Sequence, residues 1–143
     1  MNYAIRHLTN ADLEPAKGYF ETLSNLKLTV PPANASGWLE STEAQGTIIL
    51  VAALDDGNIV GSISLLLERK FLRGGVFAGH IEDVATRAGY EGKGIGRALV
   101  AAAVKSAQDA GCYKVILDCD EKLIGFYEKC GFTTFGVAMR KDF

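Results

Sequence analysis

A glycine-rich segment, EGKGIGR at 91–97, lies between a predicted strand and a predicted helix. Its three glycines leave backbone N–H groups unobstructed at the start of the helix, where the positive end of the helix dipole favours an anion such as a pyrophosphate. Its lysine and arginine add positive charge. The segment has neither the Gly-Lys-Ser/Thr ending of a P-loop nor the third spacing of the dinucleotide fingerprint. We therefore predict another kind of anion-binding loop, with a flexible turn as the alternative.

Three carboxylates lie within or directly after apolar runs. Glu82 and Asp83 are flanked by isoleucine and valine, which argues against a solvated edge, and adjacent residues of a strand point to opposite faces. Asp118 follows Val-Ile-Leu, where a carboxylate can orient an ammonium and accept its proton, although a backbone carbonyl or water could do the same. Asp120 instead suits the N-cap of the next helix.

Tyr127 and the cysteines are the remaining candidates for acid or nucleophile. A phenol keeps its proton at neutral pH and can donate it to a thiolate, but Tyr127 lies on an apolar stripe and could equally be core. The three cysteines form no CxxC or His-rich pattern, so we expect reduced, buried thiols and no metal. The alternative makes Cys119 an acyl-carrying nucleophile. Its neighbours Asp118 and Asp120 would disfavour the thiolate.

The hydrophobic pattern predicts the elements that position these residues. Thr9 and Asp12 form an approximate capping box before the first helix, and Gly111 ends the long one. In chain order we expect a strand at 3–8, a helix over about 10–25, a short helix at 36–45, a hairpin of strands at 47–56 and 58–71, a strand from 79, a long helix from about 94, a strand at 112–120, a short helix at 121–131 and a last strand at 132–141. This order implies a mixed sheet with helices on its faces.

The composition describes one ordinary domain, residues 1–143. Fifteen Lys plus Arg oppose seventeen Asp plus Glu, a net charge of −2, so a nucleic-acid or membrane-surface partner is not expected. The longest apolar runs fall short of the ~20 residues of a membrane helix, and the first residues lack the apolar core of a signal peptide. We expect a cytoplasmic protein.

The segment DVATRAGYEGKGIGRALV resembles the acetyl-CoA-binding segment of the GNAT superfamily of N-acetyltransferases, although Glu91 stands where that pattern has Gln or Arg. Three more blocks, GHIEDV, GCYKVILDCDEK and FYEKCGF, resemble the members that acetylate glucosamine 6-phosphate on the route to UDP-N-acetylglucosamine. The resemblance runs from about Glu68 to Met139. It implies the GNAT acyl-CoA N-acyltransferase fold, an α/β fold with a mixed, mostly antiparallel sheet flanked by helices.

The resemblance also implies roles for individual residues. Asp118 would lie at the substrate amine and Tyr127 at the sulfur of CoA as general acid, for direct attack without an acyl-enzyme. The residues implied for acetyl-CoA are Val84, Ala85, Thr86, Gly92, Lys93, Gly94, Ile95, Gly96, Arg97, Tyr127 and Lys129. Those implied for the sugar phosphate are Thr22, Lys70, Arg73, Glu82, Asp83, Tyr113, Lys114 and Arg140, with Lys141 as the alternative to Arg140.

Tyr113 and Lys114 further imply a homodimer whose sites are completed across the interface. Leu123 stands where the members often carry Asn, so a contact from that side chain is absent. Two other functions stay open: an acetyltransferase for another amine, such as a peptide N-terminus or a polyamine, and an inert acyl-CoA-binding module. The basic and acidic set listed for the sugar phosphate argues against the first, and the presence of Tyr127 with Asp118 argues against the second.

Overall fold

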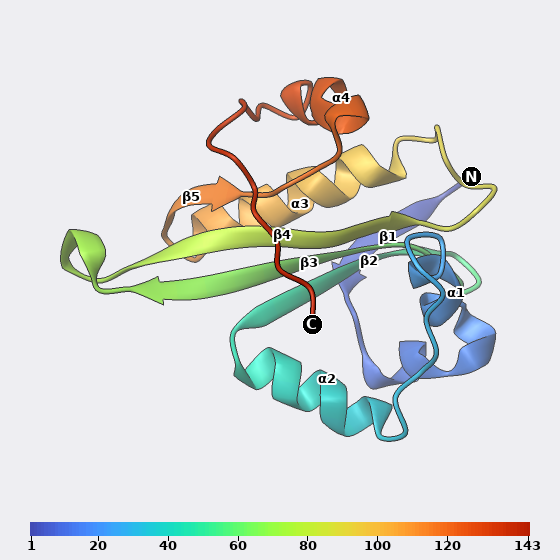
Figure 1. Ribbon diagram of the computed structural model, residues 1–143. Helices are drawn as coiled ribbons and strands as arrows, with labels where there is room; N and C mark the ends of the chain where they lie inside the picture. Colours follow the sequence, from blue (N-terminus) through green and yellow to red (C-terminus); the bar gives the residue numbers. More distant parts are fainter.

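The computed structural model describes residues 1–143 and contains one five-stranded sheet (Figure 1). Its strands are β1 (Tyr3–His7), β2 (Thr47–Leu54), β3 (Ile59–Lys70), β4 (Val76–Thr86) and β5 (Cys112–Ile116), and they lie in that order across the sheet. Neighbours are antiparallel from β1 to β4, whereas β4 and β5 run parallel. The prediction of a mixed, mostly antiparallel sheet is confirmed.

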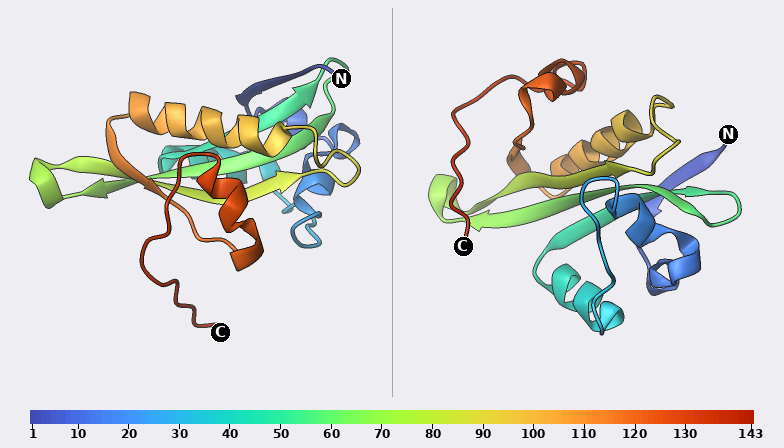
Figure 2. Two further views of the ribbon diagram at one scale, coloured as in Figure 1. Left: turned by 90° about the horizontal axis from the view of Figure 1, so that it is seen from above. Right: turned by 45° about the vertical axis from the view of Figure 1, so that its right-hand side comes forward.

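Helices cover both faces of this sheet. The long helix α3 (Ile95–Asp109) lies on one face, and α1 (Tyr19–Leu23) and α2 (Ala35–Ala44) lie on the other (Figures 1 and 2). Alternation along β2 divides the core accordingly, because Ala52 packs in the cluster that contains α3 and Val51 packs in the cluster that contains Tyr19 and Leu39. Each amphipathic element therefore buries its apolar side against the sheet.

The start of the chain differs from the predicted helix over 10–25. Two 3-10 turns, η1 (Asn10–Leu13) and η2 (Pro15–Lys17), precede the short α1. Pro15 has no N–H to donate to a helical bond, and Gly18 adopts a left-handed φ of 78°, so the chain cannot continue as one α-helix. The predicted capping contact does form, since the backbone N–H of Thr9 donates to Asp12 at 2.8 Å.

The end of the chain differs as well. After β5 come the 3-10 turn η4 (Glu121–Leu123) and the helix α4 (Ile124–Glu128), and residues 129–143 contain neither helix nor strand. The predicted last strand at 132–141 is therefore wrong for the chain taken alone, because a strand requires a hydrogen-bonded neighbour and this segment runs past the sheet without pairing (Figure 2). Every helix is too short or too polar to cross a membrane.

Candidate functional site

Strands β4 and β5 diverge near the middle of the sheet. Their parallel pairing covers Phe77 with Cys112, Gly79 with Val115 and His80 with Ile116, and it ends there, although β4 continues to Thr86. Residues 82–86 thus have no partner on the β5 side. The divergence leaves a stretch of backbone N–H and C=O groups available to a ligand that adds to the edge of β4.

The glycine-rich loop lies at the end of β4 and leads into α3. Gly92 and Gly94 adopt left-handed φ angles of 73° and 80°, and Gly94 is the N-cap of α3, so side chains there would be strained. Lys93 and Arg97 are exposed, whereas the side chain of Ile95 is buried in the core at 1% exposure. Only the backbone of Ile95 can therefore face a ligand. The glycine turn and the helix start on which the predicted anion site depends are both present, and the helix has 15 residues.

The carboxylate of Glu91 is engaged within the protein. It accepts hydrogen bonds from the backbone N–H of Gly89 at 2.7 Å and from the side-chain amide of Asn25 at 3.1 Å, and Asn25 also donates to the carbonyl of Thr86 at 2.6 Å. Hydrogen bonds from its own and the Gly89 N–H, and from Asn25, hold the pKa of Glu91 below its ordinary value. This Asn25–Glu91 clasp joins the turn after β4 to the segment that follows α1.

Tyr127 on α4 is packed between two other rings. Phe126 and Phe132 meet it edge to face at centroid distances of 4.9 and 6.0 Å, and only 9% of the residue is exposed. Its hydroxyl makes no hydrogen bond to the protein. Every fully buried side-chain oxygen has a hydrogen-bond partner, so this hydroxyl must reach the surface. Burial, followed by nearby Cys119 and Cys130, raises the pKa of Tyr127. The phenol therefore stays protonated at neutral pH.

Glu82 and Asp83 lie at a β-bulge in β4. Between the pairs Ser62–Ala85 and Ser64–Glu82, β4 carries one residue more than β3, and Asp83 has a left-handed φ of 52°. The simple alternation expected of these two acids therefore fails here, and both are exposed. Glu82 lies near Asp118 and His80, whereas Asp83 lies near Tyr19. Burial, then the charges of Asp118 and Asp83, raises the pKa of Glu82.

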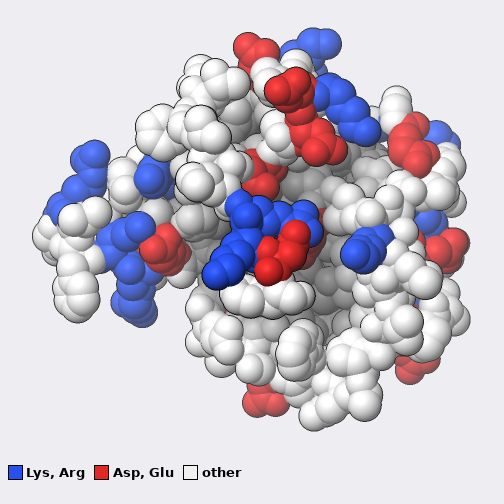
Figure 3. All heavy atoms as spheres, viewed as in Figure 1, with Lys and Arg blue, Asp and Glu red and all other residues white.

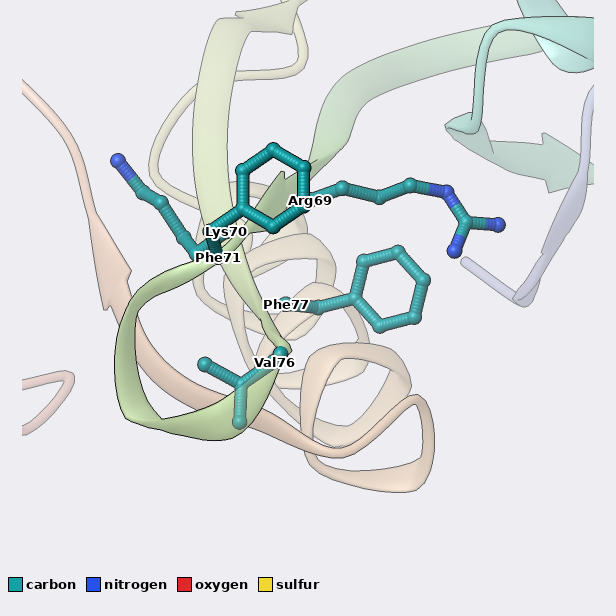
Figure 4. A pocket seen from close by; sticks show the side chains of 6 residues that line it. Arg69, Lys70, Phe71, Val76 and Phe77 are labelled. Carbon is teal, nitrogen blue, oxygen red and sulfur yellow. The ribbon is translucent and has the colours of Figure 1, made fainter.

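Basic and aromatic residues gather where the β3–β4 hairpin meets β5. The guanidinium of Arg73 lies 4.4 Å from the ring centre of Tyr113, and the ammonium of Lys114 lies 5.3 Å from it. Lys70 is not free, because its ammonium lies 2.8 Å from Glu68. At the hairpin, Lys70 and Arg69 point to opposite sides of a cavity of about 320 Å³, and Arg69 lies over Phe77 at 4.9 Å (Figure 4).

The remaining predicted basic residues lie at the end of the chain and directly after α4. Arg140 pairs with Asp142 at 2.7 Å, Lys141 lies over the ring of Phe143 at 5.9 Å, and Lys129 is exposed after α4. The face shown in Figure 3 is hollowed between this C-terminal segment and the segment that follows α1, and acidic side chains lie on its wall. Basic residues thus stand at the rim of the hollow.

Several predicted residues are placed differently from what the sequence indicated. Thr22 is fully buried, and its hydroxyl lies 2.9 Å from the carbonyl of Gly18 and 2.8 Å from that of Ile59, so it has no surface to offer a substrate. The cysteines are not buried: Cys112 and Cys130 are partly exposed and Cys119 is exposed. Asp120 occupies the N-cap of η4 without a side-chain bond. Nowhere do three His, Cys, Asp or Glu side chains gather as around a metal ion.

Two groups at the site were not singled out from the sequence. One is the Asn25–Glu91 clasp, which joins residues 66 positions apart and has no local signature. The other is His80, which hydrogen-bonds Glu68 at 2.7 Å. The sequence does contain one signal for His80, because it lies two residues before Glu82 and residues two apart on a strand share a face.

Comparison with known proteins places this geometry in a family. Residues 6–132 match the model of the Acetyltransferase (GNAT) family. The chain is 43% identical to a probable glucosamine 6-phosphate N-acetyltransferase 2 of Oryza sativa, over 94% of this chain and 84% of that protein. It is similar to the crystal structure of glucosamine-6-phosphate N-acetyltransferase from Arabidopsis thaliana, with a TM-score of 0.92 and 34% identity over 100% of this chain and 99% of that one. A Trypanosoma brucei acetyltransferase gives a TM-score of 0.90, at 36% identity over 99% of this chain and 100% of that one.

Proposed function

The chain belongs to the acetyltransferase (GNAT) family, and we propose that it transfers the acetyl group of acetyl-CoA to the amine of D-glucosamine 6-phosphate. The products are N-acetyl-D-glucosamine 6-phosphate and CoA, and the cytoplasmic route to UDP-N-acetylglucosamine is the process that would use them. The observation that supports the proposal best is the divergence of β4 and β5, which leaves the edge of β4 unpaired before the glycine-rich start of α3, and Tyr127 and Asp118 are proposed to act beside this edge. One domain, residues 1–143, would supply all of them.

Acetyl-CoA would lie along the edge of β4 that β5 leaves unpaired. Its pantetheine arm is an amide chain, and it would pair with the free edge at Val84, Ala85 and Thr86 as an added strand does. Its pyrophosphate would take the backbone N–H groups of residues 92–97 at the start of α3, with Lys93, Arg97 and Lys129 around it. The clasped Glu91 supports this placement, because its carboxylate is turned to its own hydrogen bonds and not to the anion.

The chemistry would be direct attack of the amine on the thioester carbonyl. Asp118 and Glu82 would orient the ammonium, and a backbone N–H of β4 would stabilise the tetrahedral oxyanion. The ammonium would lose one proton before the attack. As the intermediate collapses, the Tyr127 hydroxyl would protonate the departing thiolate, and the second proton that the nitrogen loses would restore the phenol. The burial that raises the pKa of Tyr127 supports this assignment, since it keeps the phenol protonated at neutral pH. The exposed thiol of Cys119 would have no covalent role.

The sugar phosphate would be held by residues of two subunits. Tyr113 lies in β5 between Cys112, which pairs with Phe77, and Val115, which pairs with Gly79. It is therefore at least three residues, about 10 Å of strand, from the level of Glu82, which is long for the distance from the amine to the phosphate of one hexose. The cluster of Arg73, Tyr113 and Lys114, with Lys70, would therefore serve the site of a second copy. Asp83 would contact the sugar in its own subunit, and Arg140 would close the site from the C-terminal segment.

The C-terminal segment supports a homodimer. Its alternate apolar residues Phe135, Val137 and Met139 are 84%, 90% and 94% exposed, which is the pattern of a strand without its partner. Pairing with a second copy would cover them. The same docking would bring Arg140 close to the interface.

A CoA-release assay tests the function. We expect turnover with glucosamine 6-phosphate and much weaker turnover with glucosamine, glucosamine 1-phosphate and a peptide amine, because only the first carries the anion in the position that the basic cluster would bind. Turnover of the peptide but of none of the sugars would refute the substrate. No turnover of any amine, with acetyl-CoA still bound, would indicate an inert binding module.

A further inference from the structure

A histidine and a glutamate on neighbouring strands form a pair on the side of the sheet that carries Glu82. Nε2 of His80 on β4 lies 2.7 Å from Oε2 of Glu68 on β3, and the other oxygen of Glu68 lies 2.8 Å from the ammonium of Lys70. Neither His80 nor Glu68 has a part in the reaction as proposed above. The question is which proton such a pair could handle.

The hydrogen bonds of Glu68 define the state of the imidazole. Those from Lys70 and His80 hold the pKa of Glu68 below its ordinary value, so the carboxylate is ionised at neutral pH. An ionised carboxylate only accepts hydrogen bonds, and Nε2 of His80 must therefore carry the proton in this pair. In the neutral ring Nδ1 is then the basic nitrogen. A base whose second nitrogen is held by a carboxylate is well suited to accept a proton, since the imidazolium that forms is stabilised.

His80 is close to the acids proposed to meet the amine. It precedes Glu82 by two residues on β4 and so shares its face, and both line a cavity of about 330 Å³ together with Gln45, Thr47, Leu66 and Glu68. The charges of His80 and Asp118 both act on Glu82. The side chain of His80 is 32% exposed, so the ring joins the cavity to solvent. The charged groups around it are Glu68, which it hydrogen-bonds, Lys70, which pairs with Glu68, and Glu82, on which the charges of both His80 and Asp118 act.

We propose that His80, held by Glu68, is the group through which the proton released by the substrate amine leaves the site. This rests on the proposed acetylation of an amino sugar. The ammonium gives its proton to the Glu82 carboxylate, and the nitrogen keeps the electron pair with which it attacks. Glu82 passes the proton through solvent in the shared cavity to Nδ1 of His80. The imidazolium then releases it to bulk water, so that both side chains return to their starting states.

The variant His80→Gln tests this role, and His7→Gln is its matched control because His7 is the other histidine of the chain and is exposed on β1. With glucosamine 6-phosphate saturating, we expect kcat of His80→Gln at neutral pH to fall about 100-fold, the effect of losing a general base. KM for acetyl-CoA should not change. Added imidazole should restore part of the lost kcat, whereas the wild type and His7→Gln should not respond to it.

Glu68→Gln provides a second readout that does not depend on His80→Gln folding well. It removes the carboxylate that accepts the hydrogen bond from Nε2 of His80, so kcat should fall while KM for acetyl-CoA stays at the wild-type value. A wild-type kcat in both variants, or a loss of kcat in His80→Gln that imidazole does not restore, would overturn the proton route. Inactivity of the wild type toward the sugar phosphate would instead refute the proposed function.

Discussion

At the scale of single residues, the position of Tyr127 decides what its phenol can do. The ring packs edge to face against Phe126 and Phe132, while the hydroxyl has no hydrogen-bond partner in the protein. A tyrosine that was merely core would gain little from a hydroxyl without a hydrogen-bond partner in the protein. The geometry therefore favours a hydroxyl that acts on a bound molecule, and it allows a substitution that removes the oxygen alone.

Tyr127→Phe should lower kcat about 100-fold, because the departing thiolate would lose its proton donor. The dissociation constant for acetyl-CoA and the melting temperature should stay close to the wild-type values, since the ring packing is retained. Steady-state kinetics measures kcat, calorimetric titration measures the dissociation constant, and scanning calorimetry measures the melting temperature. Tyr3→Phe on β1 is the control, and an unchanged kcat in Tyr127→Phe would remove the general-acid role.

Asp12 gives a residue-scale prediction about stability. Its carboxylate is 5% exposed and accepts from Arg6 at 2.7 Å, and although burial opposes it, the hydrogen bonds from Arg6 and Thr9 lower the pKa of Asp12. Asp12→Asn should reduce the free energy of unfolding at neutral pH by about 1–2 kcal/mol. A lowered pKa stabilises the fold above the unfolded value, near 4, and the contribution is lost as the pH falls through the folded value.

Urea unfolding of both proteins across the acidic range checks this. The difference between wild type and Asp12→Asn should shrink as the pH falls below about 4. Asp109→Asn, which breaks the exposed pair with Lys105, should cost less than about 0.5 kcal/mol at any pH. An equal loss from both substitutions would show that burial of Asp12 adds nothing.

At the scale of elements, the sequence predicted what depends on local pattern. The hairpin of β2 and β3, the helix α3 and the glycine turn before it follow from alternation, helical periodicity and left-handed glycines, all of which are local. The bulge at Asp83 and the Asn25–Glu91 clasp depend on residues far apart in the chain. The burial of Thr22 likewise depends on a contact with Ile59, 37 positions away. No local pattern contains these contacts.

The Asn25–Glu91 clasp should control how well the loop is placed for acetyl-CoA. Asn25→Ala removes the bonds to Thr86 and Glu91, and we expect KM for acetyl-CoA to rise about fivefold, roughly the value of one net hydrogen bond. KM for the sugar phosphate should stay at the wild-type value. Glu91→Gln keeps an oxygen for the Gly89 N–H and should have a smaller effect. Equal KM values in all three proteins would mean that the clasp does not position the loop.

At the scale of the whole molecule, the isolated chain leaves its C-terminal segment without a partner. The wrong prediction of a strand at 132–141 is informative for that reason: the alternating pattern is present in the sequence, and what the single chain lacks is a neighbour to pair with. In the proposed homodimer a second copy would supply that neighbour.

Val137→Asp should therefore convert a dimer to a monomer. The carboxylate would be buried without a partner at the interface, and the monomer should also lose turnover of the sugar phosphate because its site lacks the second copy. Sedimentation velocity and the CoA-release assay measure the two effects. Thr134→Asp adds the same charge at an exposed polar position of the segment and should remain dimeric. A wild type that sediments as a monomer would contradict the homodimer.

The short pairing of β4 with β5 has a consequence for how the molecule opens. Only three positions of β5 pair with β4, although Cys112 and Val115 also pack against the core, so β5 and α4 should open together and exchange their amide hydrogens faster than β2 and β3. A molecule of acyl-CoA lying along the free edge of β4 would bridge this seam. Binding should then slow exchange in α4 far from the glycine loop, and part of the binding free energy would be used to order the helix that carries Tyr127.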